Sequence, residues 1–222
     1  MLIADDEALV RHALRVFVNA SGDMTVVGEA LDGEVAVVEA GRLLPDVVLM
    51  DLKMPGVSGI EATQRITTAL PMVHVLAVST FSTERYVVPA LRAGASGYLV
   101  KDTEPDEILE AIREVRMGRS VISPSVTRDL ILSLRTDPLE HTLVAREPEP
   151  LTPRELSIVQ LIAQGRSNAE IARELYLAEP TIKANLGRVM VKWGVRDRVQ
   201  ALIYAITNEV VDVGTLDLRS SR

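Results

Sequence analysis

The sequence contains no cysteine, few aromatic residues and no long apolar run, and each absence excludes a class of protein. Without cysteine, the chain has neither a disulfide framework nor a thiolate metal site. Aromatic residues make up 3% of the chain, which argues against binding single-stranded nucleic acid by stacking. No apolar segment approaches the roughly 20 residues that span a bilayer, and the acidic start does not resemble a signal peptide. We therefore expect a soluble, cytoplasmic protein without a membrane partner.

Charge is distributed unevenly along the chain, whose net charge is −7. Residues 1–150 hold 14 basic and 23 acidic residues, a balance of −9, whereas residues 151–222 hold 10 and 8, a balance of +2. An acidic first part and a slightly basic last part favour two domains, the second of which meets a polyanion.

Short apolar runs alternate with helical periodicity five times along residues 1–117. The runs lie at 2–4, 24–27, 47–50, 73–78 and 98–100, and the helices are expected at about 7–19, 32–44, 59–69, 83–93 and 105–117. This alternation predicts a parallel sheet with helices on both faces. Asp32 is expected to cap the second helix and Pro105 to begin the last one. Only residues 1–4 precede the first acidic residues, so either part of the first strand is missing from this sequence or the strand is short.

Polar side chains follow four of these runs directly. Asp5 and Asp6 follow the first, Asp51 the third, Ser79 the fourth and Lys101 the fifth. The carboxyl ends of parallel strands meet at one edge, where open α/β sheets bind their ligands. Each residue has an ordinary alternative, such as a turn aspartate or a surface lysine. Together they supply a cation site, an acceptor, a hydroxyl donor and a cation, which is the set that phosphoryl transfer requires.

The order and spacing of this set resemble the receiver domain of bacterial two-component signalling, over residues 1–117. Met54-Pro55-Gly56 and residues 94–102, with Tyr98 among them, extend the likeness. The resemblance implies a doubly wound sheet with strand order 2-1-3-4-5. It also implies that a partner sensor histidine kinase phosphorylates Asp51. The implied Mg²⁺ ligands are Asp5, Asp6, Asp51 and the backbone carbonyl of Lys53, and the implied phosphoryl-binding and switch residues are Ser79, Tyr98 and Lys101.

Residues 118–150 read as a linker. A short helix is predicted at 123–134, and the remainder combines Asp137-Pro138, Pro148 and Pro150 with mixed charges.

Residues 151–207 carry the start signals of a compact helical domain. Thr152-Pro153-Arg154-Glu155 and Ser167-Asn168-Ala169-Glu170 are predicted capping boxes, and further helices are expected at about 179–193 and 197–207. Residues 208–222 are left as an unassigned tail. The third helix has an apolar face, and Lys183, Asn185, Arg188 and Lys192 lie largely off it. A helix-turn-helix fits this pattern, and an amphipathic helix with a solvated charged face is the ordinary alternative.

The same segment resembles the LuxR-type DNA-binding domain, on Leu151-Thr152-Pro153-Arg154-Glu155, Gly165, residues 167–172, Thr181-Ile182-Lys183 and Arg188. Joined to a receiver, it resembles the NarL/FixJ class of response regulators. The resemblance implies a homodimer, when phosphorylated, that binds double-stranded promoter DNA. The candidate DNA-binding residues are Thr181, Lys183, Asn185, Arg188 and Lys192. Ala178 stands where the family often has serine, and Asn185 where histidine is frequent.

Three alternatives compete with this interpretation. Haloacid-dehalogenase-like phosphatases also form an aspartyl phosphate, but they carry a second aspartate where this chain has Lys53. Regulators that switch without phosphate often lose an acid or the lysine. Here the whole set is present: Asp5, Asp6, Asp51, Ser79 and Lys101. An interaction module without DNA would lack salt-dependent binding to duplex DNA. We therefore predict a transcription regulator and not an enzyme.

Overall fold

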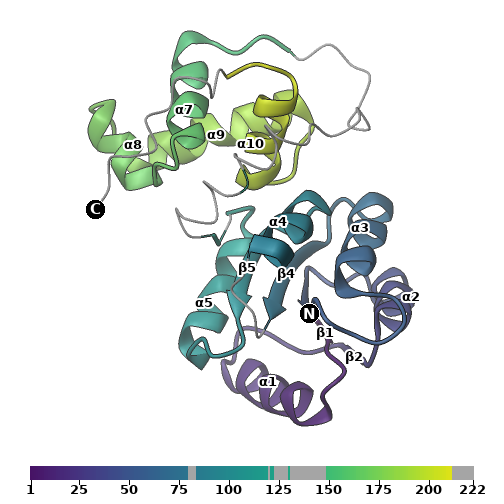
Figure 1. Ribbon diagram of the computed structural model, residues 1–222. Coiled ribbons are helices and arrows are strands. Elements are labelled where there is room, and N and C mark those ends of the chain that lie inside the picture. The colour runs from purple at the N-terminus through teal and green to yellow at the C-terminus, as the bar shows by residue number, and fades with distance from the viewer. Residues whose placement is uncertain (80–83, 120, 123–129, 131–148, 212–222) are drawn as a thin grey trace. The chain divides into compact units, whose positions relative to one another are not determined.

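The computed structural model describes residues 1–79, 84–119, 121–122, 130 and 149–211, and the chain divides into two compact units, Met1–Ile122 and Ser123–Arg222 (Figure 1). Each unit is described by itself below. Most of the predicted linker, the predicted helix at 123–134 except Leu130, and residues 212–222 of the tail lie outside the described residues. Those three assignments stay predictions.

The first unit is built on a five-stranded parallel sheet in the order β2-β1-β3-β4-β5. The strands are β1 (Leu2–Ala4), β2 (Gly28–Ala30), β3 (Val47–Asp51), β4 (His74–Ser79) and β5 (Gly97–Val100). All of β3 is buried, as expected for a strand that is covered on both faces. The predicted strand order is therefore confirmed.

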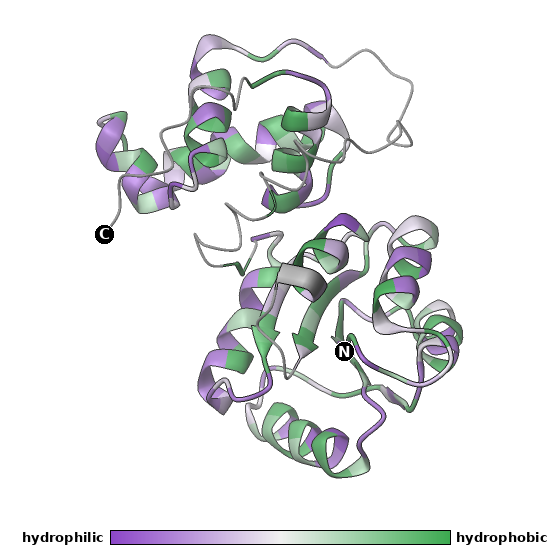
Figure 2. Cartoon of the chain, in the orientation of Figure 1, coloured by the Kyte–Doolittle hydropathy of each residue, from purple (hydrophilic) through white to green (hydrophobic). Residues whose placement is uncertain are grey.

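Two helical layers cover the sheet, which consequently separates two hydrophobic cores (Figures 1 and 2). The helices of this unit are α1 (Ala8–Ala20), α2 (Gly33–Leu43), α3 (Gly59–Ala69), α4 (Glu84–Arg92) and α5 (Pro105–Arg116). Along β3, Val48 and Met50 pack with α2 and α3, whereas Val47 and Leu49 pack with α1 and α5. Successive side chains of a strand point to opposite faces, and this alternation supplies both cores.

Local signals fixed most of the element boundaries. Asp32 caps α2 by accepting a hydrogen bond from the Val35 amide at 2.8 Å, and Pro105 is the first residue of α5, as predicted. The prediction for the second strand was wrong, because β2 is Gly28–Ala30 and not residues 24–27. The Val27 amide does bond to the Met1 carbonyl, but the ladder with β1 begins where Gly28 pairs with Leu2.

Residues 149–211 of the second unit contain helices α7 (Pro153–Ala163), α8 (Asn168–Glu174), α9 (Glu179–Trp193) and α10 (Arg198–Thr207). Both predicted capping boxes are present, at the starts of α7 and α8. The Trp193 ring stacks on Tyr204 with centroids 4.8 Å apart, which fastens the end of α9 to α10. The core of this unit is formed by Ile158, Ile162, Ile171, Ile182, Val189 and Leu202.

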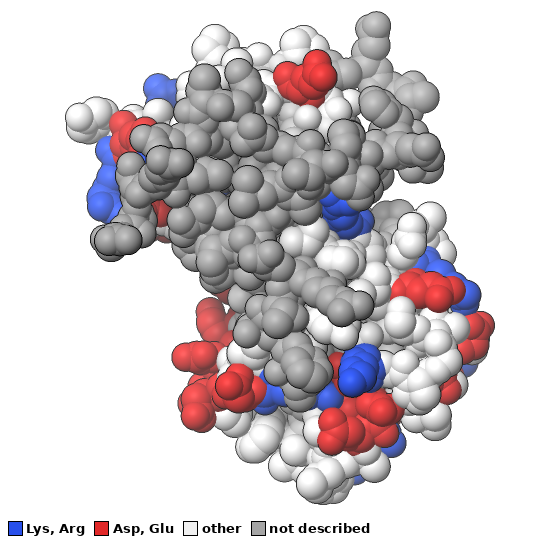
Figure 3. Space-filling model, in the orientation of Figure 1, with Lys and Arg blue, Asp and Glu red and all other residues white. Residues whose placement is uncertain are grey.

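The surface of the first unit carries a group of acidic side chains. On the side of the first unit that Figure 3 shows, acidic side chains gather at α5, where Asp106, Glu107 and Glu110 are exposed. Within the described part of the chain, no helix is both long enough and apolar enough to cross a membrane.

Candidate functional site

Three carboxylates meet at the carboxyl edge of the sheet. Asp5 directly follows β1 and Asp51 ends β3, and these two strands are neighbours that pair at Ala4 and Met50. One oxygen from each of Asp5, Asp6 and Asp51 lies within 4.8 Å of the others. Asp5 and Asp51 are buried, whereas Asp6 is exposed. The sheet therefore brings together the three acids that the sequence singled out.

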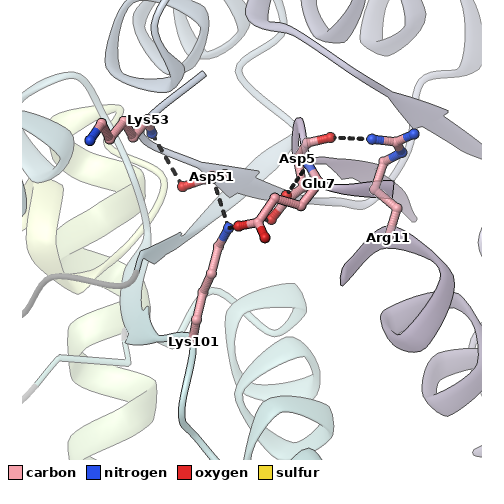
Figure 4. A network of polar contacts seen from close by, with 6 residues as sticks. All are labelled: Asp5, Glu7, Arg11, Asp51, Lys53 and Lys101. Atoms are coloured by element: carbon pink, nitrogen blue, oxygen red, sulfur yellow. Dashed lines mark hydrogen bonds and ion pairs between the residues drawn. The ribbon is translucent and has the colours of Figure 1, made fainter. Parts of the chain in front are cut away.

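Lys101 neutralises part of this charge from the end of β5 (Figure 4). Its Nζ lies 2.8 Å from Asp5 Oδ2, 2.9 Å from Asp51 Oδ2 and 3.3 Å from Glu7 Oε1. Burial alone would lower the pKa of Lys101, but the bonds to Asp5 and Asp51 outweigh burial and raise it. The lysine is thus a fixed cation beside the candidate acceptor. Glu7 was not singled out from the sequence, because an acid after two others reads as part of a solvated helix start.

Backbone groups hold both buried acids in place (Figure 4). Asp51 Oδ1 accepts a hydrogen bond from the Lys53 amide at 3.2 Å, and Asp5 Oδ1 accepts one from the Glu7 amide at 2.8 Å. Burial raises the pKa of Asp51, and the bonds from Lys101 and from the Lys53 amide oppose this rise. The Arg11 Nη1 donates to the Asp5 carbonyl at 2.7 Å and ties α1 to the same loop.

Gly59 holds the loop after β3 against the start of α3, a contribution that the sequence did not reveal. A Cβ at this position would lie 1.8 Å from the Asp51 carbonyl oxygen, so only glycine permits the approach. The Gly59 amide also donates to the Leu52 carbonyl at 3.2 Å. A glycine at the start of a predicted helix, just after Pro55-Gly56, was the available signal.

Ser79 and Tyr98 lie on the neighbouring strands β4 and β5. Ser79 ends β4 and is buried, and its carbonyl accepts a hydrogen bond from the Lys101 amide at 2.8 Å. Tyr98 is 9% exposed on β5. Burial raises the pKa of Tyr98, and a hydrogen bond with Ser79 opposes that rise. The predicted hydroxyl donor and the predicted switch aromatic are therefore in contact.

The oxygen atoms of this pocket form a donor set for a hard divalent cation. Carboxylate oxygens suit Mg²⁺, which keeps several waters and needs few protein ligands. Two buried carboxylates share one lysine, so the pocket retains negative charge that a cation would offset. The residues present therefore fit the ion.

The candidate DNA-binding residues of α9 divide into two groups. Thr181, Lys183 and Arg188 are exposed. Lys192 Nζ instead donates to the buried Glu155 carboxylate at 2.8 Å, and the Asn185 side chain is buried. Ala178 is the N-cap residue of α9 and makes no side-chain capping bond. The structure thus directs only part of the predicted set outward.

Glu155 organises the inner side of α9, although the sequence indicated only a capping role for it. Its Oε2 accepts hydrogen bonds from Lys192 Nζ and from the Thr152 amide, both at 2.8 Å. The bond from Lys192, joined by those from Thr152, lowers the pKa of Glu155 to about 2. One acid thereby caps α7 and holds α9.

A doubly wound sheet with an acidic pocket, followed by a helix-turn-helix unit, defines a response regulator. Residues 1–113 match the response regulator receiver domain family, and residues 149–205 match the luxR family of bacterial regulatory proteins. The chain belongs to these families: it is a DNA-binding response regulator of the LuxR type, which confirms the predicted family.

Transcriptional regulators are among the most similar relatives. The chain is 43% identical over 209 residues to the uncharacterized transcriptional regulatory protein YxjL of Bacillus subtilis, covering 94% of this chain and 95% of the relative. It is 36% identical over 204 residues to the nitrate/nitrite response regulator protein NarL of Escherichia coli K12, covering 92% and 93%.

Solved structures agree with this assignment. The response regulator ChrA of a heme-sensing two-component system is 32% identical, with a TM-score of 0.50, and the match covers 95% of this chain and 97% of that one. A LuxR-family response regulator from Aurantimonas sp. SI85-9A1 is also 32% identical, with a TM-score of 0.55, covering 61% and 96%.

Proposed function

We propose that a partner sensor histidine kinase switches this transcription regulator by phosphorylating Asp51, and that phosphorylation promotes dimerisation and promoter binding. The observation that carries the proposal is the lysine held between two buried carboxylates, with Lys101 Nζ 2.8 Å from Asp5 and 2.9 Å from Asp51. An ion pair that only stabilises the fold needs one acid. Because Lys101 has two buried partners, we interpret one of them, Asp51, as a reactive group. Ser79 and Tyr98 would supply the hydroxyl donor for the phosphoryl group and the aromatic residue of the switch.

The pocket would hold Mg²⁺ through Asp5, Asp6, Asp51 and the backbone carbonyl of Lys53. When bound, Mg²⁺ neutralises negative charge on the phosphoryl oxygens and on the carboxylates around them. No enzyme-like turnover of outside substrates is proposed, since the residue two positions after Asp51 is Lys53 and not a general acid.

Phosphoryl transfer to Asp51 needs little covalent chemistry from the protein beyond positioning and charge. An Asp51 carboxylate oxygen attacks the phosphorus of the donor phosphohistidine, the P–N bond breaks, and the imidazole keeps the electron pair. Lys101 then pairs with the phosphoryl group in place of the free carboxylate. The Ser79 hydroxyl donates a hydrogen bond to a phosphoryl oxygen, which changes its contact with Tyr98. This is a local charge that biases a two-state element.

The helix-turn-helix unit explains why dimerisation would be the output. A single recognition helix contacts few bases, and two copies on adjacent half-sites gain affinity from being linked. A phosphorylation event that pairs two chains therefore raises promoter binding without any change in the DNA contacts themselves.

The test is light scattering after gel filtration, with and without beryllofluoride and Mg²⁺ as the phosphoryl mimic. We expect wild type to shift from monomer to dimer and Asp51→Asn to stay unchanged. Asp46→Asn, an exposed acid outside the pocket, is the matched control and should behave as wild type. In parallel, acetyl phosphate should label wild type and not Asp51→Asn. Labelling of Asp51→Asn, or a mimic-bound protein that stays monomeric on DNA, would refute the proposal.

A further inference from the structure

The guanidinium of Arg188 is held on the exposed side of α9 by one hydrogen bond and one ion pair within the protein itself. Its Nη2 donates to Asn185 Oδ1 at 2.6 Å, and its Nε lies 3.6 Å from Glu155 Oε1. The Arg188 side chain is nevertheless 59% exposed. An exposed arginine ordinarily samples many rotamers, and the hydrogen bond to Asn185 together with the ion pair to Glu155 restricts this one.

Asn185 is buried and turned away from any base in this arrangement. Its Nδ2 donates to the Thr181 carbonyl at 2.7 Å and its Oδ1 accepts from Arg188, while the residue as a whole is 5% exposed. Recognition of adenine by asparagine needs both ends of the amide at the groove. The amide of Asn185 is instead turned toward its own helix.

The geometry of the guanidinium decides which of its donors remain available. Nε and Nη2 lie on one edge of the planar group, and that edge faces Asn185 and Glu155. The outer fork, formed by the remaining N–H groups of Nη1 and Nη2, has no acceptor among the residues that the structure describes, and it belongs to an exposed side chain. Such a fork pairs in a bidentate way with a phosphate or with the O6 and N7 atoms of guanine.

Glu155 is a rigid support for this arrangement. Its side chain is 2% exposed and its other oxygen is occupied by Lys192 and the Thr152 amide. Because the bond from the Thr152 amide ties the Glu155 carboxylate to the N-cap of α7, the oxygen that faces Arg188 does not depend on the rotamers of α9 side chains for its position.

We propose that Asn185 is a positioning residue of the DNA interface: with Glu155, it fixes the inner edge of Arg188 so that the outer fork is presented to DNA. The inference rests on the DNA-binding function of the helical unit and goes beyond it by separating the residue that touches DNA from the one that aims it. Preorganisation of this kind reduces the side-chain entropy that is lost on binding.

The experiment measures the affinity of the full-length chain for duplex DNA by fluorescence anisotropy, over salt concentrations of about 50 to 200 mM. Two probes of about 30 base pairs are used, one of mixed sequence and one of alternating adenine and thymine. The variants are Asn185→Ala, Arg188→Ala, the double variant, and Arg188→Lys, which keeps the charge without the fork. Asn208→Ala is the matched control, because Asn208 Nδ2 makes the same bond to a helix carbonyl, of Tyr204 at 2.9 Å, away from α9.

We expect Asn185→Ala to weaken binding about two- to tenfold, from the cost of immobilising one side chain. The same substitution should have no further effect in the Arg188→Ala background, and Arg188→Lys should lose about as much as Asn185→Ala. Asn208→Ala should bind as wild type. Fluorescence of Trp193, the single tryptophan of the chain, confirms that each variant is folded under the assay conditions.

The two probes identify what the fork contacts. If it contacts a phosphate, Arg188→Ala weakens binding to both probes and lowers the salt slope by about 0.9. If it contacts guanine, the loss appears only on the mixed sequence. Either result supports the proposal.

Three results would overturn it. A loss from Asn185→Ala that is equal in both backgrounds would mean that Asn185 acts by itself. An unchanged affinity for Asn185→Ala, or for Arg188→Ala, would mean that the network does not serve binding, while DNA binding itself would stand. Failure of wild type to bind either duplex in a salt-dependent way would instead remove the DNA-binding function.

Discussion

The stability of the helical unit is expected to depend strongly on the charge of Glu155. The variant Glu155→Gln keeps the shape of the side chain and an oxygen for the Thr152 amide, but it removes the partner of two cations. Lys192 would lose a 2.8 Å charge-assisted hydrogen bond, and the Arg188 guanidinium would lose its nearby anion. Hydrogen bonds to charged groups contribute about 1.5–3 kcal/mol.

Partial exposure of Lys192 limits the expected loss. Its side chain is 17% exposed and can turn toward water when the acid is gone, so the full 3–5 kcal/mol of a broken buried pair does not apply. We expect the free energy of unfolding to fall by about 1–3 kcal/mol, which for a domain of this size lowers its melting temperature by at least about 4 °C. The assay is denaturation followed by Trp193 fluorescence, which reports on this unit alone.

Glu170→Gln is the internal control for the loss of a capping-box charge. Glu170 occupies the same position of the second capping box, but its carboxylate is 39% exposed and its ion pair with Arg166 is 3.9 Å long. We expect a change within about 0.5 kcal/mol, as for most surface substitutions. Equal effects of the two substitutions would show that the buried ion pair contributes nothing beyond the cap.

The pH dependence provides a further check. The pKa of Glu155 is lowered from its ordinary value to about 2 by the bond from Lys192. A lowered folded-state pKa stabilises the protein above the unfolded-state pKa near 4.3, and this contribution is lost as the pH falls toward 2. The stability difference between wild type and Glu155→Gln should therefore shrink over that interval. A difference that stays constant down to pH 2 would refute the assigned ion pair.

Three further substitutions test other parts of the structure. Lys101→Met leaves two buried acids without their cation, so the receiver unit should melt at a lower temperature without Mg²⁺ and bind Mg²⁺ more tightly; unchanged Mg²⁺ affinity in a melting titration would contradict this. Gly59→Ala places a Cβ 1.8 Å from a backbone oxygen of the acidic loop and should lower both receiver stability and Mg²⁺ affinity, and retention of wild-type values would show that the loop adapts. Gly187→Ala adds a Cβ that meets no atom within 4 Å and should raise the unfolding free energy by about 1 kcal/mol, as should Gly41→Ala; a loss of stability in either would contradict the free space around it.

The acidic pocket could be predicted from the sequence because its information is local. A buried strand that ends on a polar residue places that residue at the ligand-binding edge of a parallel sheet. Four such strands then bring residues from positions 5 to 101 together without any knowledge of side-chain packing. The role of Gly59 was not predicted, because it depends on how closely two backbone segments approach each other. Sequence patterns do not encode that distance.

The inner contacts of α9 could not be predicted, because they depend on a residue from another helix. Helical spacing placed Asn185 and Lys192 away from the apolar stripe, and a polar residue off the stripe reads as exposed. Glu155, contributed by α7, supplies a buried acceptor for Lys192, whereas Asn185 bonds within α9 to the Thr181 carbonyl and to Arg188. The β2 boundary shifted for a related reason, since strand pairing with β1 and not hydrophobicity decides which residues join the ladder.

The two units use the same device, a buried acid holding a lysine, with opposite charge balances. In the first unit, the carboxylates of Asp5, Glu7 and Asp51 surround the single ammonium of Lys101, so negative charge remains and favours a divalent cation. In the second, the single carboxylate of Glu155 faces both Lys192 and Arg188, so positive charge remains on the helix and favours a polyanion. The excess in the first unit lies on buried carboxylates, so salt screens it less than it screens charges on the surface. Removal of one charge, as in Lys101→Met or Glu155→Gln, is therefore expected to change the net charge at one site and to leave that of the other site unchanged.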